Sequence, residues 1–141
     1  MERIDFLGFE VTYLHAEGDG VAMLEWSAPR GAGGIPIHVH EHTDEGFYVL
    51  RGRLGLWIDG EELVRDAGSY TVVRPGPRHS FCNPSDEPAA YLTPIAPAGF
   101  ADYLRELAAG LARTRSEEGA AALRARLAAR NDITVVGPPP R

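Results

Sequence analysis

The sequence contains a single cysteine, no lysine and no long apolar run. One cysteine, Cys82, cannot form an intramolecular disulfide, which is typical of a reducing compartment. All 14 basic residues are arginines, and 20 aspartates and glutamates outnumber them to give a net charge of −6. Because no basic stripe offsets this balance, nucleic acids and anionic membranes are disfavoured as partners. No segment approaches the roughly 18 apolar residues that span a bilayer, so we expect a soluble, cytoplasmic protein.

Short strand-like segments separated by glycine and proline turns fill residues 1–97. The pair Asp59-Gly60, between LWI and EELV, favours a hairpin because a type I′ turn needs positive φ at both central residues. Many short strands with regular turns indicate an antiparallel sandwich or a closed barrel. We therefore predict an all-β domain over residues 1–97.

The apolar period changes from two to about 3.6 beyond residue 97, which predicts a helical extension and tail over residues 98–141. The second helix of this extension is expected to begin at Thr114, whose spacing to Glu117 matches a capping box, and to stop at Asn131-Asp132. The segment ITVV that follows reads as extended. We interpret the extension as a packing or dimerisation element rather than a catalytic one.

An apolar face of the first predicted helix carries Phe100, Leu104 and Leu107. Such a face needs a partner surface, and the edge strands of a small barrel also need cover. We therefore expect a two-fold homodimer.

The stretch HVHEHTDEG, residues 38–46, places three histidines and three carboxylates within nine positions. Side chains two apart on a strand point the same way, so His38 and His40 share a face if residues 35–40 are extended. His42 lies in the turn that follows, where alternation does not fix its direction. We interpret His42 as an exposed residue, or one beside the ligands at the entrance to the site.

A turn over residues 41–44 would return the chain as an antiparallel partner strand. Residues directly opposite in such a pair project to the same side. This geometry predicts Glu45 across from His40 and Phe47 across from His38.

A fourth candidate ligand, His79, follows the turn formed by PGP in RPGPRHSFCNP. On a strand, His79 and Phe81 share a face while Cys82 points away from it. Three imidazoles and one carboxylate form a mixed nitrogen and oxygen set that suits Fe, Mn, Co, Ni or Zn better than Ca or Mg. We expect Phe47 and Phe81 to line a substrate pocket beside this site.

Two spacings in the chain resemble the two motifs of the cupin superfamily. The first is His38-x-His40-x4-Glu45-x6-Gly52, and the second, preceded by Gly68, is Gly76-x2-His79-x3-Asn83. The resemblance covers about residues 8–97. It implies a cupin-type antiparallel β-barrel, also called a double-stranded β-helix or jelly roll, with a metal inside. The segment HVHEHTDEGFYVLRG, together with a helical tail ending in VVGPP, resembles the corresponding sequence of quercetin 2,3-dioxygenase-like monocupins.

The resemblance implies one divalent transition metal held by His38, His40, Glu45 and His79, its identity left open among Fe, Ni, Co, Mn and Zn. In dioxygenases of this kind the metal orients an enolised substrate and the glutamate takes a proton from its hydroxyl before O₂ attacks. We therefore predict a metal-dependent dioxygenase for a small phenolic or enolic compound. Two alternatives stay open: a non-redox metal enzyme (isomerase, cyclase or lyase) and a non-catalytic binding protein. Glu45 is expected to act as a ligand, a base or both.

Overall fold

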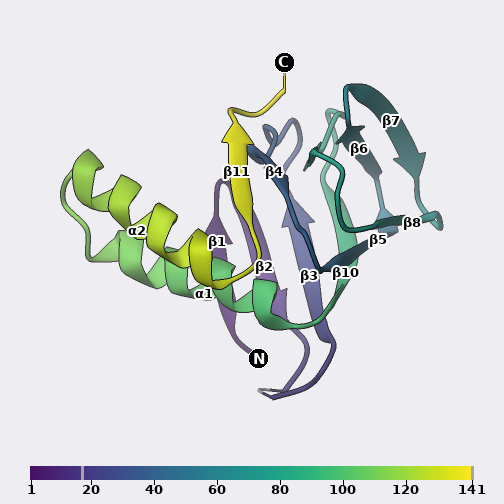
Figure 1. The fold of residues 1–141 in the computed structure, drawn as a ribbon. Coiled ribbons are helices and arrows are strands. Elements are labelled where there is room, and N and C mark those ends of the chain that lie inside the picture. The colour runs from purple at the N-terminus through teal and green to yellow at the C-terminus, as the bar shows by residue number, and fades with distance from the viewer. Residues whose placement is uncertain (17, 141) are drawn as a thin grey trace.

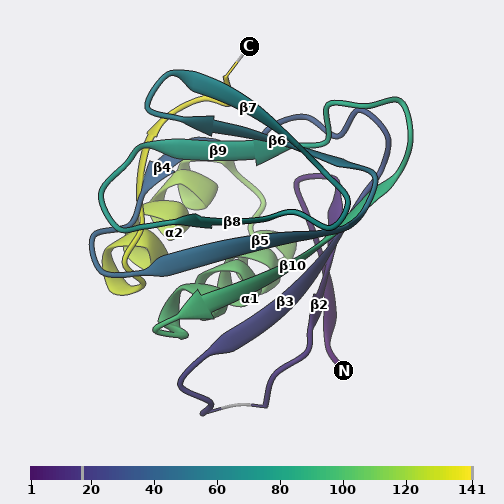
Figure 2. The same cartoon turned by 90° about the vertical axis from the view of Figure 1, so that its right-hand side faces the viewer.

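Two antiparallel sheets face each other in the computed structural model, which describes residues 1–16 and 18–140 (Figure 2). The strand orders are β1-β2-β3-β10-β5-β8 in the six-stranded sheet and β11-β4-β9-β6-β7 in the five-stranded sheet. The elements are β1 (Arg3–Phe6), β2 (Phe9–Tyr13), β3 (Ala22–Ala28), β4 (Ile37–Val39), β5 (Asp44–Arg51), β6 (Arg53–Ile58), β7 (Glu61–Asp66), β8 (Tyr70–Val73), β9 (His79–Cys82), β10 (Ala89–Ala96), α1 (Gly99–Ala112), α2 (Glu117–Arg130) and β11 (Thr134–Gly137). The predicted jelly roll with C-terminal helices is confirmed.

Aromatic side chains from both sheets fill the space between them. Strand β3 alternates buried and half-buried residues, as expected for a strand with one face on a core. Its Trp26 makes edge contacts with Phe9 of the neighbouring strand β2, at 5.4 Å between ring centroids, and with Phe81 of the opposite sheet, at 5.0 Å. Edge-to-face contacts at such distances add to the stabilisation from burial. The sheets are therefore joined through one aromatic cluster.

The hairpin between β6 and β7 forms at the turn that the sequence predicts. Asp59 and Gly60 have φ values of 47° and 90°, as a type I′ turn requires. Ile58 and Glu61 pair across the turn, which fixes the register of the two strands.

Gly52 occupies the turn between β5 and β6, where the chain passes from one sheet to the other. Its φ is +73°, and a Cβ there would lie 2.7 Å from the Ala89 side chain and 2.8 Å from the Pro88 carbonyl oxygen. Gly68 shares the positive φ, at +88°, but a Cβ at Gly68 would meet nothing within 4 Å. Alanine at Gly68 would therefore introduce backbone strain alone, whereas alanine at Gly52 would introduce both backbone strain and steric overlap.

We expect Gly68→Ala to lower the free energy of unfolding by about 1–2 kcal/mol, which is the cost of left-handed φ alone. Gly52→Ala should cost roughly a further 1–3 kcal/mol because the added methyl also overlaps its neighbours. Urea denaturation of both variants measures the difference. Equal losses would mean that the chain around Gly52 moves aside without cost.

The second helix begins two residues later than predicted. Ser116, not Thr114, is its N-cap: Ser116 is extended (φ −134°, ψ 154°) and its Oγ accepts a hydrogen bond from the Gly119 amide at 3.0 Å. The Thr114 hydroxyl instead donates to the Gly110 carbonyl at 2.8 Å and so belongs to the end of α1. Asn131 caps the C-terminus of α2, as predicted.

The apolar face of α1 is covered by the chain itself. Phe100, Leu104 and Leu107 are 4%, 2% and 3% exposed, and they belong to the same hydrophobic core as the barrel. Helices α1 and α2 lie side by side along one side of the strands (Figure 1). The expectation that a second copy covers this face is therefore wrong, and the homodimer stays a prediction without this support. Neither helix is long and apolar enough to cross a bilayer within the described part of the chain.

The C-terminal extension returns to the barrel through β11. This strand pairs with β4, with Val135 opposite His38 and Thr134 opposite Val39 (Figure 1). The extended segment predicted after α2 thus becomes the edge strand of the five-stranded sheet. Residues beyond α2 are consequently part of the sheet that carries the histidines.

Candidate metal centre

Four side chains converge inside the barrel: His38, His40, Glu45 and His79. Each is at most 3% exposed, and each offers one ligand atom to a group whose members all lie within 4.8 Å of one another. His38 lies in β4 and His40 just after it, Glu45 lies in β5, and His79 begins β9. The cluster therefore draws on both sheets, and it can hold a metal ion.

The strand pairing that brings these residues together differs from the prediction. Strand β4 does not form a hairpin with β5; it pairs with β9, where His38 lies directly opposite His79, and with β11. Strand β5 belongs to the other sheet and pairs with β8 and β10. Residues between the two strands therefore cross from one sheet to the other. Glu45 faces His40 across the barrel interior, not across a hairpin.

The backbone orients the three histidine rings so that their Nε2 atoms face the cluster. Each ring makes a hydrogen bond from Nδ1 to a carbonyl oxygen; the pairs are His38 with Pro36 (2.8 Å), His40 with Asp132 (2.7 Å) and His79 with Pro77 (3.2 Å). Because a carbonyl oxygen only accepts, each Nδ1 carries the proton and each Nε2 presents a lone pair. The Nε2 atoms of His38 and His40 are buried and lack a hydrogen-bond partner among residues 1–16 and 18–140.

Glu45 brings a carboxylate oxygen into the midst of these lone pairs. Its Oε1 lies 3.1 Å from Nε2 of His79 and 3.5 Å from Nε2 of His40. An ionised carboxylate and a neutral imidazole nitrogen are both acceptors, so their close approach needs a shared proton or a cation. Buried acceptors without a donor are costly unless something positive satisfies them. The donor set therefore fits a divalent transition metal.

Electrostatics favour two of the charge states that such an ion requires, a neutral His38 and an ionised Glu45. Burial and, to a lesser extent, neighbouring His79 lower the pKa of His38 to about 3, so His38 is neutral at pH 7. Burial opposes ionisation of Glu45, but the His40 and His79 rings, which can donate to it when protonated, outweigh burial and hold the Glu45 pKa well below its usual range. Burial also opposes a charged His40, yet a protonated His40 gains more from Glu45, so the His40 pKa is raised and a metal ion at this site must displace that proton. The site thus combines one anionic oxygen with imidazole nitrogens.

Asp132 holds the segment that follows β4 in place through hydrogen bonds. Its carbonyl oxygen orients His40, and its carboxylate accepts three hydrogen bonds, from the Glu41 amide (2.9 Å), the His42 amide (2.9 Å) and the Thr43 hydroxyl (2.6 Å). Its φ is 55°, in the left-handed region that few residues other than glycine adopt. The sequence marks Asp132 only as a helix stop, because nothing local pairs it with residues some ninety positions earlier. Asp132 therefore couples the C-terminal extension to the cluster.

We expect Asp132→Gly to weaken metal binding by about 10-fold, the lower end of the range for losing an outer hydrogen-bond partner, because the carboxylate holds the segment between His40 and Glu45 while the backbone carbonyl that orients His40 is kept. Glycine accepts the positive φ, so the variant removes the carboxylate without adding backbone strain. Competition against a chromogenic chelator measures the change. Asp86→Ala, which removes an exposed carboxylate remote from the cluster, is the control. An unchanged dissociation constant for Asp132→Gly would show that the segment holds its shape unaided.

The remaining predicted site residues occupy three different environments. His42 points to solvent with 79% of its side chain exposed and lies outside the cluster. Phe81 lines the cavity beside the cluster. Phe47 does not line it: Phe47 is fully buried, and its ring packs behind that of Phe81 at 5.0 Å between centroids. Phe81 thus lines this cavity and Phe47 does not, and a role of the cavity as a substrate pocket stays a prediction.

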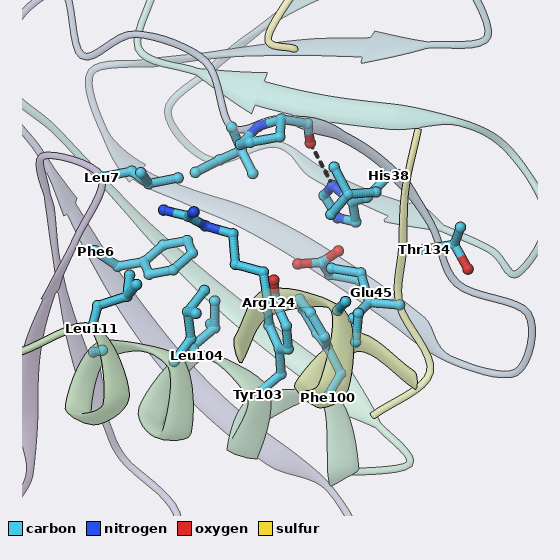
Figure 3. A pocket seen from close by; sticks show the side chains of 18 of the residues that line it. Phe6, Leu7, His38, Glu45, Phe100, Tyr103, Leu104, Leu111, Arg124 and Thr134 are labelled. Atoms are coloured by element: carbon cyan, nitrogen blue, oxygen red, sulfur yellow. Dashed lines mark hydrogen bonds between the residues drawn. The ribbon is translucent and has the colours of Figure 1, made fainter. Parts of the chain in front are cut away.

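A cavity of about 830 Å³ opens onto the cluster between the barrel and the two helices, and it reaches His38 and Glu45 (Figure 3). Phe100 of α1 lies at its inner end, with its ring 4.2 Å from that of His40. Both helices and β11 contribute lining residues, so the extension is more than the packing or dimerisation element that the sequence suggested. The sequence predicts only that the apolar helix face is covered, because no local pattern distinguishes a packing face from a cavity wall.

The jelly-roll barrel and its internal cluster of histidines and one glutamate can now be compared with known protein families. The model of the Cupin domain matches residues 24–95, and the chain belongs to this family. Over 47 residues it is 44% identical to quercetin 2,3-dioxygenase of Bacillus subtilis, a match that covers 33% of this chain and 14% of that enzyme. The chain thus spans a small part of that relative.

Solved structures agree on the fold. The cupin domain of Schizosaccharomyces pombe Cnp3 superposes with a TM-score of 0.61 at 17% identity, covering 74% of each chain. Pac13 from Streptomyces, a nucleoside dehydratase, superposes with a TM-score of 0.58 at 18% identity, covering 68% of this chain and 75% of Pac13. At these identities the likeness shows a shared cupin fold.

Proposed function

We propose that this cupin is a metal-dependent dioxygenase acting on a small phenolic or enolic compound. The observation that carries the proposal is the set of three backbone-oriented histidines and one ionised carboxylate at the inner end of an apolar cavity. His38, His40 and His79 would hold a divalent transition metal, with Glu45 as a fourth ligand or a neighbour. When bound, such an ion supplies a Lewis acid beside the hydroxyl of the substrate and access to reaction with O₂.

Glu45 is the group in this cavity suited to take a proton. It is ionised, it lines the cavity that reaches the cluster, and a substrate hydroxyl placed beside His38 comes within its reach. The proton moves from that hydroxyl to a Glu45 carboxylate oxygen, which leaves an enolate in the cavity. Phe81 and Phe100 line the same space and exclude water, which strengthens electrostatic interactions there.

Local similarity to quercetin 2,3-dioxygenase supports the redox reaction. The shared fold of Pac13, a dehydratase, is a reason to test the alternative in which proton transfer at Glu45 serves an isomerase, cyclase or lyase without O₂. Both reactions use the same base and the same cavity, so dependence on O₂ distinguishes them.

The test is metal analysis of protein purified without oxygen, followed by O₂ uptake on a panel of flavonols, catechols and other enols. The proposal expects about one redox-active metal per chain and O₂ uptake with at least one compound. Protein that carries a redox-silent ion such as Zn and consumes no O₂ with any compound would overturn the dioxygenase. Conversion of a panel compound without O₂ uptake would identify the non-redox enzyme instead.

A further inference from the structure

Helix α2 presents one charged side chain and several small ones to the cavity. Its lining residues recur at helical spacing: Ala121, Arg124, Ala125, Ala128 and Ala129. Alanine methyl groups occupy little volume, so this face leaves space between α2 and the barrel. Figure 3 shows the Arg124 side chain reaching into that space. The helix therefore leaves room for a ligand and supplies one positive charge to it.

Arg124 has no carboxylate partner within the part of the chain that the structure describes. The arginines in ion pairs there are Arg53, Arg74, Arg78, Arg105 and Arg130. Asp5 and Glu45 also line the cavity, but neither lies within ion-pairing distance of Arg124. Arg124 is exposed to solvent on one side while it lines the cavity on the other, and its planar guanidinium is a geometrically selective partner for a carboxylate.

Aromatic rings connect the Arg124 end of the cavity to the cluster. Tyr103 lies near Arg124: burial raises the pKa of Tyr103, and the positive charge of Arg124 partly offsets this. The ring of Tyr103 stacks beside that of Phe100, at 6.0 Å and 18° between planes, and Phe100 lies 4.2 Å from His40. Helix α1 thus provides a path of ring surfaces along which a flat molecule longer than one ring can lie.

We propose that the cavity takes a planar aromatic or enolic carboxylic acid. Its hydroxyl end faces the cluster of His38, His40, Glu45 and His79, its rings lie along Phe100 and Tyr103, and its carboxylate pairs with Arg124. The placement of the hydroxyl end rests on the proposed function, whereas the pairing with Arg124 does not depend on which reaction follows.

The test measures binding of 6-hydroxy-2-naphthoic acid and of its methyl ester to the metal-containing protein, followed by naphthol fluorescence. The two probes share size and rings, but only the acid offers a carboxylate. The parent protein should bind the acid about two- to fivefold more tightly than the ester, the range expected for an ion pair with an exposed guanidinium. Arg124→Gln should weaken binding of the acid by about the same factor and leave binding of the ester unchanged. Arg124→Lys should recover part of the loss because it keeps the charge.

Arg126→Gln is the matched control, because Arg126 is an exposed arginine of the same helix that does not line the cavity. Equal binding of acid and ester by the parent, binding of neither, or equal effects of the two Gln variants would each overturn the proposal. Metal content should be the same in all variants. If the protein binds the acid through Arg124 but consumes no O₂, only the proposed dioxygenase activity is contradicted. If the protein consumes O₂ only with neutral enols, and Arg124→Gln does not change this uptake, only the inference about Arg124 is contradicted.

Discussion

Glu45→Gln is expected to lower kcat by about 10²- to 10⁴-fold in protein that retains its metal, the range typical of a lost general base. Gln keeps the size of Glu45 and an oxygen that can still face His40 and His79, but it cannot accept a proton from a substrate hydroxyl. The three histidine Nε2 atoms are untouched, since backbone carbonyls orient their rings. The substitution should therefore lower kcat far more than it lowers the affinity for the metal.

The experiment compares kcat for metal-loaded parent and Glu45→Gln, with metal content measured on the same samples. Glu41→Gln is the control, because Glu41 lies in the adjoining segment with its side chain 76% exposed. Equal turnover in the loaded Glu45 variant would refute Glu45 as base and leave it a ligand that tunes the ion. Loss of the metal itself would show that Glu45 mainly holds the ion.

His79→Ala is expected to remove nearly all of the metal, and His38→Ala and His40→Ala should do the same. Each change deletes one of three converging nitrogen ligands, so affinity should fall by more than the roughly 100-fold that loss of an outer partner costs. His42→Ala should keep the stoichiometry of the parent, because His42 faces solvent.

Thermal unfolding with and without chelator provides an independent measurement. An ion bound only to the folded state stabilises it by about 4 kcal/mol when its concentration is a thousand times its dissociation constant. Chelator should therefore lower the Tm of the parent and of His42→Ala, and should change the Tm of His79→Ala little. An empty site in His42→Ala, or a full one in His79→Ala, would contradict the geometry of the cluster.

Spacing along the chain was sufficient to select the four residues that converge, but not the strand pairing that brings them together. His38, His40, Glu45 and His79 could be selected because alternation on strands gives each a direction. The pairing of their strands could not be predicted. Strands that follow each other in sequence suggest a hairpin, whereas β4 and β5 lie in different sheets. Residues far apart in the chain make the contacts that matter, such as His38 with His79.

The helical extension was the least predictable part of the site. Arg124 and Asp132 look like ordinary polar residues at the surface or end of a helix, and their roles depend on how the helices return to the barrel. The apolar residues Phe100 and Leu104 were recognised as a buried face, but the surface that buries them was assigned to a second copy. A sequence pattern shows that a face is covered and not what covers it.

The hydrogen bonds to Asp132 have a consequence for the order of events during synthesis. His40 is oriented by a carbonyl that leaves the ribosome ninety-two residues after it, and β4, already paired with β9, gains its second neighbouring strand only when β11 arrives. A nascent chain in which β1 to β10 have already paired therefore still lacks part of the support for its histidines. We therefore expect this cluster to take up an ion late, in a chain whose barrel has already formed.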